Sequence, residues 1–304
     1  MAVLNARTAL LVNPVARRGA GAESAVRCAF RAAGVEPTVA YTQCAGDGVR
    51  AARALAAAHD RLFVLGGDGT VMEAVTGLAH AGAAIPIGIL PAGTGNQLAR
   101  ALSISLAPPR AVRQLLEGTA CQVDVGLLNG DRRVGIGVGL GLDAAMIAGA
   151  RVPLKRYLGA ASYVVAATVA AMRPRRFMVR AEVDGQIVER DATVAMVLNL
   201  GRVFKNLIEI APGASLVDGQ LDLVIVDARS LADALSFSLL EMLLRRRRAD
   251  PRWTFLRGTS LCIQTNDHGI PAQVDGDLID AQRLCMQVVP RGGLFLVPAG
   301  RRVI

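Results

Sequence analysis

The chain has 304 residues, a length typical of about two domains. Hydrophobic residues make up 52% and charged residues 19%, which excludes a disordered chain and allows a sizeable core. Aromatic residues make up only 4%, so that core must be aliphatic. The net charge is +9, and Lys155 and Lys205 are the only lysines among 34 basic residues. The excess of arginine suits phosphate or an anionic surface, with coding bias as the alternative.

The cysteines and apolar segments bear on the compartment. An odd set of cysteines without a C-x-x-C pair predicts unpaired thiols in a reducing, cytosolic environment. The histidines form no zinc-binding cluster, and the N-terminus has no signal-peptide pattern. The longest apolar stretch, 158–172, is shorter than the roughly 20 residues that cross a bilayer. We therefore expect a cytoplasmic protein whose membrane contact, if any, is peripheral, at the inner surface. The cysteines are Cys28, Cys44, Cys121, Cys262 and Cys285.

The first part of the chain alternates short apolar runs with helical patterns. This alternation is typical of a doubly wound α/β domain with a parallel sheet. In such sheets ligands bind just beyond the carboxyl ends of the strands. Strands are predicted at 8–12, 37–42, 61–65 and 85–90, and helices at 23–33, 49–58 and 71–79.

The pattern changes near residues 121–125, where a mostly antiparallel β domain is predicted to begin. The dipeptide Asp184-Gly185 between two strands indicates a hairpin. We expect an α/β nucleotide-binding domain at 1–124, a β-rich domain at 125–290, and a segment at 291–304 that packs back on the first domain. Strands are predicted at 134–140, 179–183, 187–189, 194–198, 221–226, 261–264 and 283–289, with helices at 158–172 and 231–244.

The strongest motif is Gly66-Gly67-Asp68-Gly69-Thr70, between a predicted strand and a predicted helix. Its glycines allow a close approach to phosphate, and the helix offers free N–H groups at the positive end of its dipole. Thr70 adds a hydroxyl donor, whereas Asp68 is better suited to a metal or a proton. The alternative is a tight turn, because Asp-Gly pairs also occur at 47–48, 184–185, 218–219 and 275–276.

A second motif, Pro91-Ala92-Gly93-Thr94-Gly95-Asn96, follows the next strand and is expected beside the first. Thr94 and Asn96 can hydrogen-bond a nucleotide, while Gly93 and Gly95 keep the backbone open. Alone it is only a flexible loop. The chain has no G-x-x-x-x-G-K-[ST] sequence and no G-x-G-x-x-G after its first strand, which disfavours a P-loop or a dinucleotide site.

With these motifs the chain resembles the diacylglycerol kinase catalytic family, which includes bacterial lipid kinases, sphingosine kinases and ceramide kinases. The sugar-phosphate and NAD kinases share only the Gly-Gly-Asp-Gly element. The resemblance implies an α/β nucleotide domain like that of NAD kinases beside an antiparallel β-sandwich, with the site in the cleft between them. Other matching segments contain Asn13-Pro14, Glu73, Gly77-Leu78, Asp124-Val125-Gly126, Gly141-Leu142-Asp143-Ala144, Ala211-Pro212, Asp218-Gly219-Gln220-Leu221-Asp222 and Val274-Asp275-Gly276-Asp277.

The resemblance also implies roles for single residues. Asp277 would accept the proton of the acceptor hydroxyl, and Asp68 would organise the phosphates and the metal. Mg²⁺ would be held by the carboxylate of Asp218 and the main-chain carbonyls of Ser215 and Gln220, with an Asx-turn as the alternative for Asp218. ATP would be bound by Asn13, Thr42, Gly66, Gly67, Asp68, Gly69, Thr70, Val71, Met72, Glu73, Gly93, Thr94 and Asn96.

Several positions depart from the family pattern. Asp277 stands where the family usually has the longer Glu, and Gln97 stands where it usually has Asp. Met72 replaces an Asn, and the turn after Asn13-Pro14 carries Arg17 and Arg18, which are candidates for contact with the triphosphate. These changes bear on the acceptor and the rate more than on the nucleotide site.

Two basic clusters, Arg173 with Arg175 and Arg176, and residues 245–248, are candidates for docking on anionic lipid. The alternative is a solvated face or the charged end of a helix. No nucleic-acid-binding fold is recognised, so nucleic acid is not expected as a partner. The oligomeric state stays open, a homodimer included.

These observations favour an ATP- and Mg²⁺-dependent lipid kinase that transfers the γ-phosphate to the hydroxyl of a diacylglycerol-like or sphingoid lipid. Two alternatives remain. One is a kinase of a soluble acceptor such as NAD or a sugar. The other is a catalytically weakened regulator that binds lipid or nucleotide.

Overall fold

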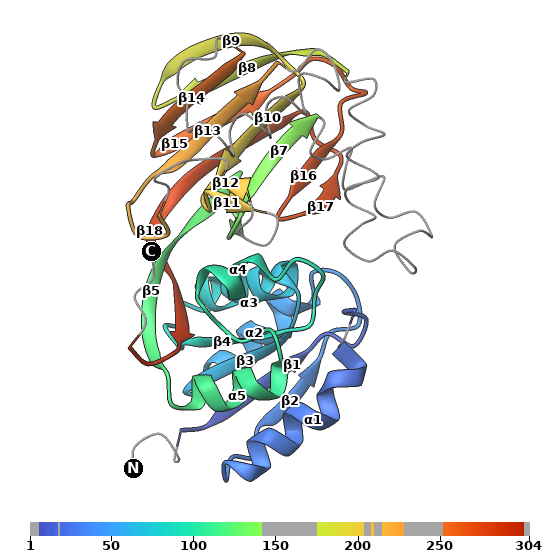
Figure 1. Cartoon of the computed structure of the whole chain (residues 1–304), viewed down its shortest axis with the longest axis vertical. Coiled ribbons are helices and arrows are strands. Elements are labelled where there is room, and N and C mark those ends of the chain that lie inside the picture. The colour runs from blue at the N-terminus through green and yellow to red at the C-terminus, as the bar shows by residue number, and fades with distance from the viewer. Residues whose placement is uncertain are drawn as a thin grey trace.

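The computed structural model describes residues 6–17, 19–141, 175–203, 208–209, 215–227 and 252–300. Figure 1 shows an α/β domain below and a β-sandwich above. The predicted helices at 158–172 and 231–244, Arg18, Arg173 and the basic run at 245–248 lie outside the described residues.

The α/β domain is built on four parallel strands in the order β2-β1-β3-β4. In the register of this sheet, Val12 lies between Tyr41 and Leu65. Every residue of β1, β3 and β4 is buried, which explains why these strands are continuous apolar runs rather than alternating ones. The strands are β1 (Thr8–Val12), β2 (Thr38–Tyr41), β3 (Arg61–Gly66) and β4 (Ile87–Pro91).

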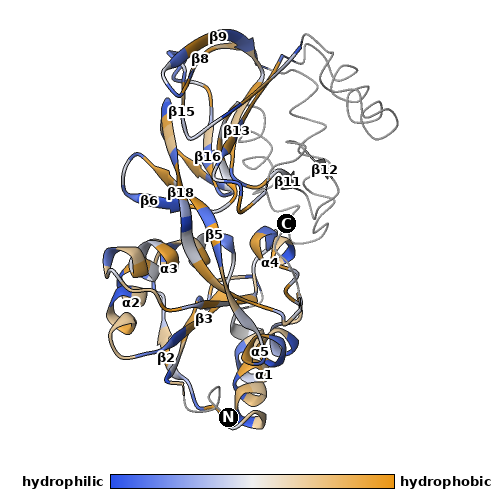
Figure 2. Ribbon diagram, turned by 90° about the vertical axis from the view of Figure 1, so that its left-hand side faces the viewer, coloured by the Kyte–Doolittle hydropathy of each residue, from blue (hydrophilic) through white to orange (hydrophobic). Residues whose placement is uncertain are grey.

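Helices cover both faces of this sheet. Figure 2 shows α2 and α3 on one side of the strands and α1 and α5 on the other. The predicted doubly wound α/β fold is thus confirmed. Helices α4 and α5 were not predicted from the sequence. The helices are α1 (Gly19–Ala32), α2 (Asp47–Ala56), α3 (Asp68–His80), α4 (Gln97–Ala101) and α5 (Pro108–Leu116).

The upper domain is the expected antiparallel sandwich. Its first sheet has the order β14-β13-β10-β7-β16-β17, and β18-β15-β8-β9 form the second. Side chains from both sheets share one core, and the alternating burial of β8 marks the inner and outer faces. The first sheet contains β7 (Gly137–Gly141), β10 (Val194–Leu198), β13 (Leu221–Val226), β14 (Trp253–Gly258), β16 (Ala272–Val274) and β17 (Asp277–Ile279).

Two long strands join the domains. β18 (Arg283–Val297) pairs with β15 in the sandwich and, through Phe295, with Ile87 of β4 in the parallel sheet. β5 (Thr119–Leu128) runs antiparallel beside it, and both cross between the domains in Figure 1. The expected boundaries at residues 124 and 290 fall within these strands. The other strands are β6 (Arg132–Val134), β8 (Phe177–Val183), β9 (Gln186–Ala192), β11 (Arg202–Val203), β12 (Ile208–Glu209) and β15 (Ser260–Gln264).

The prediction of unpaired cysteines is wrong for two of the five. Cys262 of β15 and Cys285 of β18 are register partners and form a disulfide, while Cys28, Cys44 and Cys121 are free. The pair was missed because strand pairing, and not sequence spacing, brings the two positions together. None of the helices in the described part of the chain is long and apolar enough to cross a membrane.

Candidate active site

The predicted nucleotide-binding residues gather at the carboxyl edge of the parallel sheet. Asn13 follows β1, Thr42 follows β2, Gly67 follows β3, and Gly93 lies just after β4. The Nδ2 of Asn13 donates a hydrogen bond to Oγ1 of Thr70 at 2.8 Å, which ties the first loop to the third. The structure thus brings together residues that are 80 positions apart in the sequence.

The two glycine motifs touch each other through their backbones. A Cβ on Gly93 would lie 2.6 Å from the Cα of Gly67, a distance that real side chains do not tolerate. Gly67 is the N-cap of α3 and has no side-chain cap, so the first N–H groups of the helix have no partner from a capping side chain. The first turn of this helix contains residues 68–70, which were predicted as loop. Such a helix start favours an anion.

Asp68 makes a contact that the sequence did not predict. Its two carboxylate oxygens accept the N–H groups of Gln97 and Leu98 at 3.0 and 3.1 Å. These N–H groups belong to the first turn of α4, so Asp68 caps α4 and clamps the second motif to the first. Burial raises the pKa of Asp68. Each carboxylate oxygen thus accepts one backbone amide, and the side chain links the two glycine motifs.

Glu73 and Asn96 also make internal contacts. The carboxylate of Glu73 accepts the N–H groups of Gly46 and Gly48, both at 2.9 Å, and so caps α2. Asn96 exchanges two hydrogen bonds of 3.0 Å with the main chain of Gly93 and closes the second motif. Both were predicted to bind nucleotide, and in the structure each is hydrogen-bonded to main-chain groups at this edge of the sheet.

The other predicted nucleotide contacts differ in exposure. Val71 and Met72 are buried, so only their main chain can reach a ligand. Thr42 and Thr70 are also buried, whereas Thr94 is partly exposed. Arg17 is exposed beyond β1.

Asp277 reaches this edge from the other domain. It begins β17, and a Cβ on Gly69 would lie 3.1 Å from its Oδ2. An exposed carboxylate of the sandwich therefore stands beside the first turn of α3. This is the position from which a base could meet a hydroxyl group next to bound phosphate.

Two residues earlier, Asp275 is buried and was not predicted as a site residue. Its Oδ1 accepts the N–H groups of Ile136 and Gly137 at 2.7 and 3.1 Å, and its Oδ2 accepts that of Gly135 at 3.1 Å. Burial raises the pKa of Asp275 to about 6, although these hydrogen bonds and the charge of Arg132 lower it. The signal in the sequence that could have pointed to Asp275 was an Asp-Gly pair directly before Asp277.

The predicted Mg²⁺ ligands lie in a loop in which the carboxylate of Asp218 accepts backbone N–H groups. Both oxygens of Asp218 accept N–H groups of its own loop, those of Ser215 at 3.2 Å and Gln220 at 3.0 Å, as expected for an Asx-turn. The guanidinium of Arg257 lies 3.8 Å from Oδ2 and supplies the positive charge there. Among the described residues, no group of three or more His, Cys, Asp or Glu side chains is placed to hold a metal ion.

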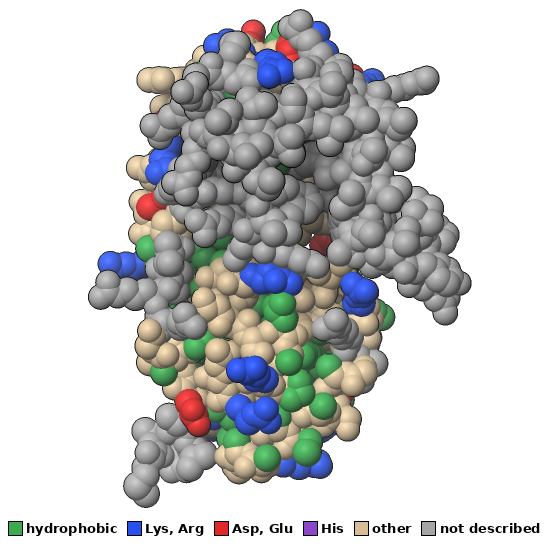
Figure 3. Space-filling model, in the orientation of Figure 1, with side chains coloured by type: hydrophobic (Ala, Val, Ile, Leu, Met, Phe, Trp, Pro, Cys, Tyr) green, Lys and Arg blue, Asp and Glu red, His purple; other side chains and the backbone are tan. Residues whose placement is uncertain are grey.

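The described members of the basic clusters are engaged within the protein. Arg175 pairs with Asp267 at 2.8 Å, and Arg176 pairs with Asp227 and Asp191 at 2.8 and 3.0 Å. The charges of these two arginines are therefore paired at the surface of the sandwich. Figure 3 shows basic side chains spread over the visible face of the α/β domain rather than gathered in one patch.

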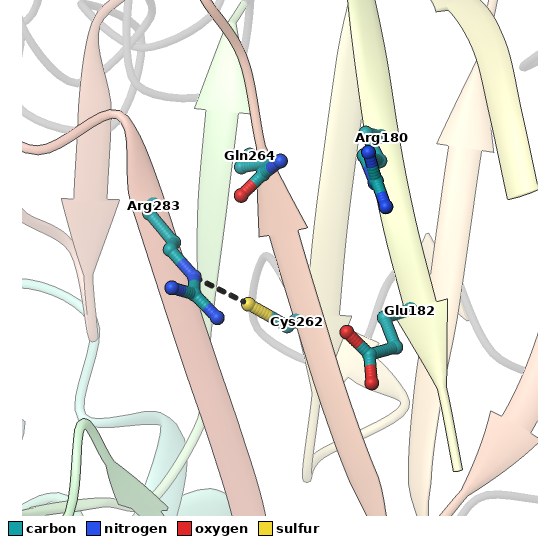
Figure 4. Close-up of a pocket in the computed structure, with 5 residues that line it drawn as sticks. All are labelled: Arg180, Glu182, Cys262, Gln264 and Arg283. Atoms are coloured by element: carbon teal, nitrogen blue, oxygen red, sulfur yellow. Dashed lines mark hydrogen bonds between the residues drawn. The ribbon is translucent and has the colours of Figure 1, made fainter. Parts of the chain in front are cut away.

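A pocket of about 250 Å³ lies away from this edge, on the outer face of the sandwich. Figure 4 shows that its lining comes from three neighbouring strands, with Arg283 donating to the sulfur of Cys262 at 3.3 Å. The lining is polar and carries both signs of charge, unlike a pocket for an acyl chain. It consists of Arg180, Glu182, Cys262, Gln264 and Arg283.

Comparison with known proteins agrees with this geometry. The family model of the diacylglycerol kinase catalytic domain matches residues 7–128, and that of the YegS C-terminal NAD kinase beta sandwich-like domain matches residues 137–295. A diacylglycerol kinase of Bacillus subtilis (strain 168) is 31% identical over 215 residues, which are 70% of each chain. A diacylglycerol kinase of Staphylococcus carnosus (strain TM300) is 31% identical over 66% of this chain, and the match spans 65% of that relative's length.

The fold comparison covers almost the whole chain. A crystal structure of a diacylglycerol kinase from Bacillus anthracis str. Sterne superposes with a TM-score of 0.78 at 22% identity, covering 96% of this chain and 97% of that one. At this identity the likeness shows a shared fold. The resemblance based on the two glycine motifs is confirmed by the family models. The chain belongs to the diacylglycerol kinase family and carries both the catalytic α/β domain and the sandwich domain.

Proposed function

We propose that this protein is a lipid kinase that transfers the γ-phosphate of ATP to a lipid hydroxyl group. The observation that carries the proposal is the placement of Asp277 beside Gly69 in the first turn of α3. A candidate base and a candidate phosphate site thus lie side by side, although they belong to different domains. The names of the relatives support a lipid as the acceptor.

The triphosphate would lie against the first turn of α3. The backbone can approach it there because glycines stand at positions 66, 67 and 69, and the positive end of the helix dipole favours its charge. Mg²⁺ would arrive as part of the MgATP substrate, since it commonly binds phosphate oxygens and retains water. No step requires a metal held by Asp218.

The carboxylate of Asp277 would take the proton of the lipid hydroxyl as its oxygen attacks the γ-phosphorus. One oxygen–phosphorus bond forms, the bond to the β-phosphate oxygen breaks, and ADP leaves. Asp is one methylene shorter than the Glu usual in the family. The short distance between Asp277 and α3 supports the reach of the shorter side chain.

The test is a transfer assay with radiolabelled ATP and Mg²⁺ against a lipid panel in mixed micelles. The panel holds diacylglycerol, monoacylglycerol, ceramide and sphingosine, and NAD and a sugar serve as soluble acceptors. We expect label in at least one lipid with the wild type and almost none with Asp277→Asn. If only NAD or the sugar becomes labelled, the acceptor is a soluble molecule and the proposal of a lipid acceptor fails. If calorimetry detects ATP binding but no acceptor becomes labelled, the kinase proposal fails and the protein is a regulator that binds nucleotide.

A further inference from the structure

We propose that Asp275 is a positioning residue that fixes the β16–β17 hairpin so that Asp277 stands over the first turn of α3. The inference rests on the proposed kinase function. It adds a residue that touches neither nucleotide nor lipid and acts through Asp277. The contacts of the hairpin carry the argument.

The hairpin has the tightest connection that antiparallel strands allow. Val274 pairs with Asp277, so the loop contains only Asp275 and Gly276. Both have positive φ, +50° and +89°, as a two-residue turn of this hand requires. A positive φ is unfavourable for Asp, and its side-chain hydrogen bonds hold it in that conformation.

The anchor of Asp275 lies at the start of β7, the strand that pairs with β16 in the same sheet. Its three hydrogen-bond donors are the N–H groups of residues 135–137, the turn between β6 and β7. Hydrogen bonds to a charged acceptor are about twice as strong as neutral ones, and a buried one is costly to lose. The tip of the hairpin is therefore fixed to this turn.

The same turn rests on the α/β domain. A Cβ on Gly135 would lie 2.8 Å from the Sδ of Met72 in α3 and 3.0 Å from Cδ1 of Leu98 in α4. The N–H of Leu98 in turn donates to Asp68, at the start of α3. The contacts close a ring from Asp68 through α4, the 135–137 turn and the hairpin back to Gly69. The side chain of Asp275 joins the hairpin to this ring, in addition to the pairing of β16 with β7 and the hydrogen bond from its own N–H to the carbonyl of Gly137 at 2.9 Å.

A matched control exists in the same domain. Asp184 and Gly185 connect β8 and β9 by a turn with nearly equal φ values, +47° and +86°. The carboxylate of Asp184 accepts the N–H groups of Thr259 and Ser260. That hairpin has no contact with the α/β domain among those described, so it tests the effect of weakening such a turn without moving Asp277.

The main experiment compares Asp275→Asn with Asp184→Asn. An amide keeps one acceptor but turns an N–H group toward a backbone donor, so Asp275→Asn loses at least one of three hydrogen bonds. A displacement of about 1 Å costs on the order of 10²-fold in rate. We expect kcat to fall by about that factor in Asp275→Asn, with the Kd for ATP within threefold of the wild type. Asp184→Asn should keep the wild-type kcat.

A double variant separates positioning from a general loss of structure. If Asp275 acts only through Asp277, then Asp275→Asn combined with Asp277→Asn is no slower than Asp277→Asn alone. If the kcat of the double variant falls by the product of the two single reductions, the proposal is overturned. So would an unchanged kcat in the Asp275→Asn variant.

Amide hydrogen exchange gives a readout that does not depend on turnover. Asp275→Asn should speed exchange in residues 272–279 and 135–137, while α3 keeps its protection. If the wild type phosphorylates no acceptor, the kinase proposal fails, and this measurement still decides whether Asp275 holds the hairpin; unchanged exchange would overturn that role. If Asp275→Asn does not fold, Gly276→Ala strains the same turn and is measured in its place, with the same two outcomes.

Discussion

Two hairpins of the sandwich share the tripeptide Val-Asp-Gly and the same two-residue turn, but their aspartates behave in opposite ways. Asp184 lies at the surface, and hydrogen bonds from Ser260 and Thr259 lower its pKa. Asp275 accepts three N–H groups and still has a pKa raised to about 6, because its carboxylate is buried. Identical local sequence thus gives identical backbone, and the surroundings decide the chemistry.

The residues after the two turns differ in what they reach. Gln186 follows one turn and Asp277 the other, and each begins an edge strand of its sheet. The edge formed by β9 faces away from the α/β domain in Figure 1, whereas β17 lies above it. A carboxylate at position 277 can serve a reaction at α3, whereas a side chain at position 186 cannot.

The largest expected effect is on turnover. We expect Asp277→Asn to lower kcat by 10²- to 10⁴-fold, the usual contribution of a general base, with the Kd for ATP nearly unchanged. Gln186→Ala, at the same place in the other hairpin, should leave kcat at its wild-type value. Steady-state transfer from labelled ATP measures both. A fully active Asp277→Asn variant would show that another group takes the proton.

The next effect is on the pH dependence of stability. Asp275 binds its proton more tightly in the folded protein, with a pKa of about 6 against an ordinary value of 3.8. The free energy of unfolding should therefore fall as the pH rises from about 4 to 6, by up to about 3 kcal/mol from this group, and change little above.

Asp275→Asn should remove this slope, while Asp68 and Asp222, whose pKa values are also raised by burial, act equally in both proteins. Urea unfolding at pH 4, 5, 6 and 7 measures the difference. Asp184 has a lowered pKa, so Asp184→Asn should instead remove stability that is present above about pH 4 and lost on acidification. Equal pH slopes in all three proteins would contradict the contrast between the hairpins.

A smaller effect is expected from the glycines of the turns. Gly276 and Gly185 have φ of +89° and +86°, and nothing lies within 4 Å of a Cβ at either position. Each change to Ala should cost about 1–2 kcal/mol of unfolding free energy, from backbone strain alone. Only Gly276→Ala should also lower kcat. A loss of turnover in Gly185→Ala would mean that the sandwich acts on the site as a whole.

The smallest effect concerns the glycines that face the two hairpins. A Cβ on Gly69 would meet Asp277 at 3.1 Å, and a Cβ on Gly258 would meet Asp184 at 2.6 Å. Gly69→Ala should displace the Asp277 carboxylate by a few tenths of an ångström and lower kcat by roughly a few-fold at saturating ATP. Gly258→Ala should move only Asp184 and leave kcat unchanged. Equal kcat values in Gly69→Ala and Gly258→Ala would mean that Asp277 lies farther from α3 than the structure shows.

Much of the fold could be predicted from the sequence because its signals are local. The run 8–12 is the observed β1, and Asp184-Gly185 forms the predicted hairpin. The predicted strand at 134–140 was wrong as one element, since it is divided into β6 and β7 by the turn that Asp275 binds. The short helix α4 was missed because its N-terminal cap, Asp68, lies 29 residues earlier in the sequence.

By itself the sequence determined the alternation of strands and helices, the glycine motifs and the family, since each depends on residue types at short spacing. Only the tertiary structure decided how far each carboxylate is buried and which backbone donors surround it. Asp68, Glu73 and Asp275 are bound to backbone amides, and Asp277 alone of these four is exposed. An Asp-Gly pair has the same backbone preference wherever it occurs. Its role depends on burial and on donors brought from distant parts of the chain.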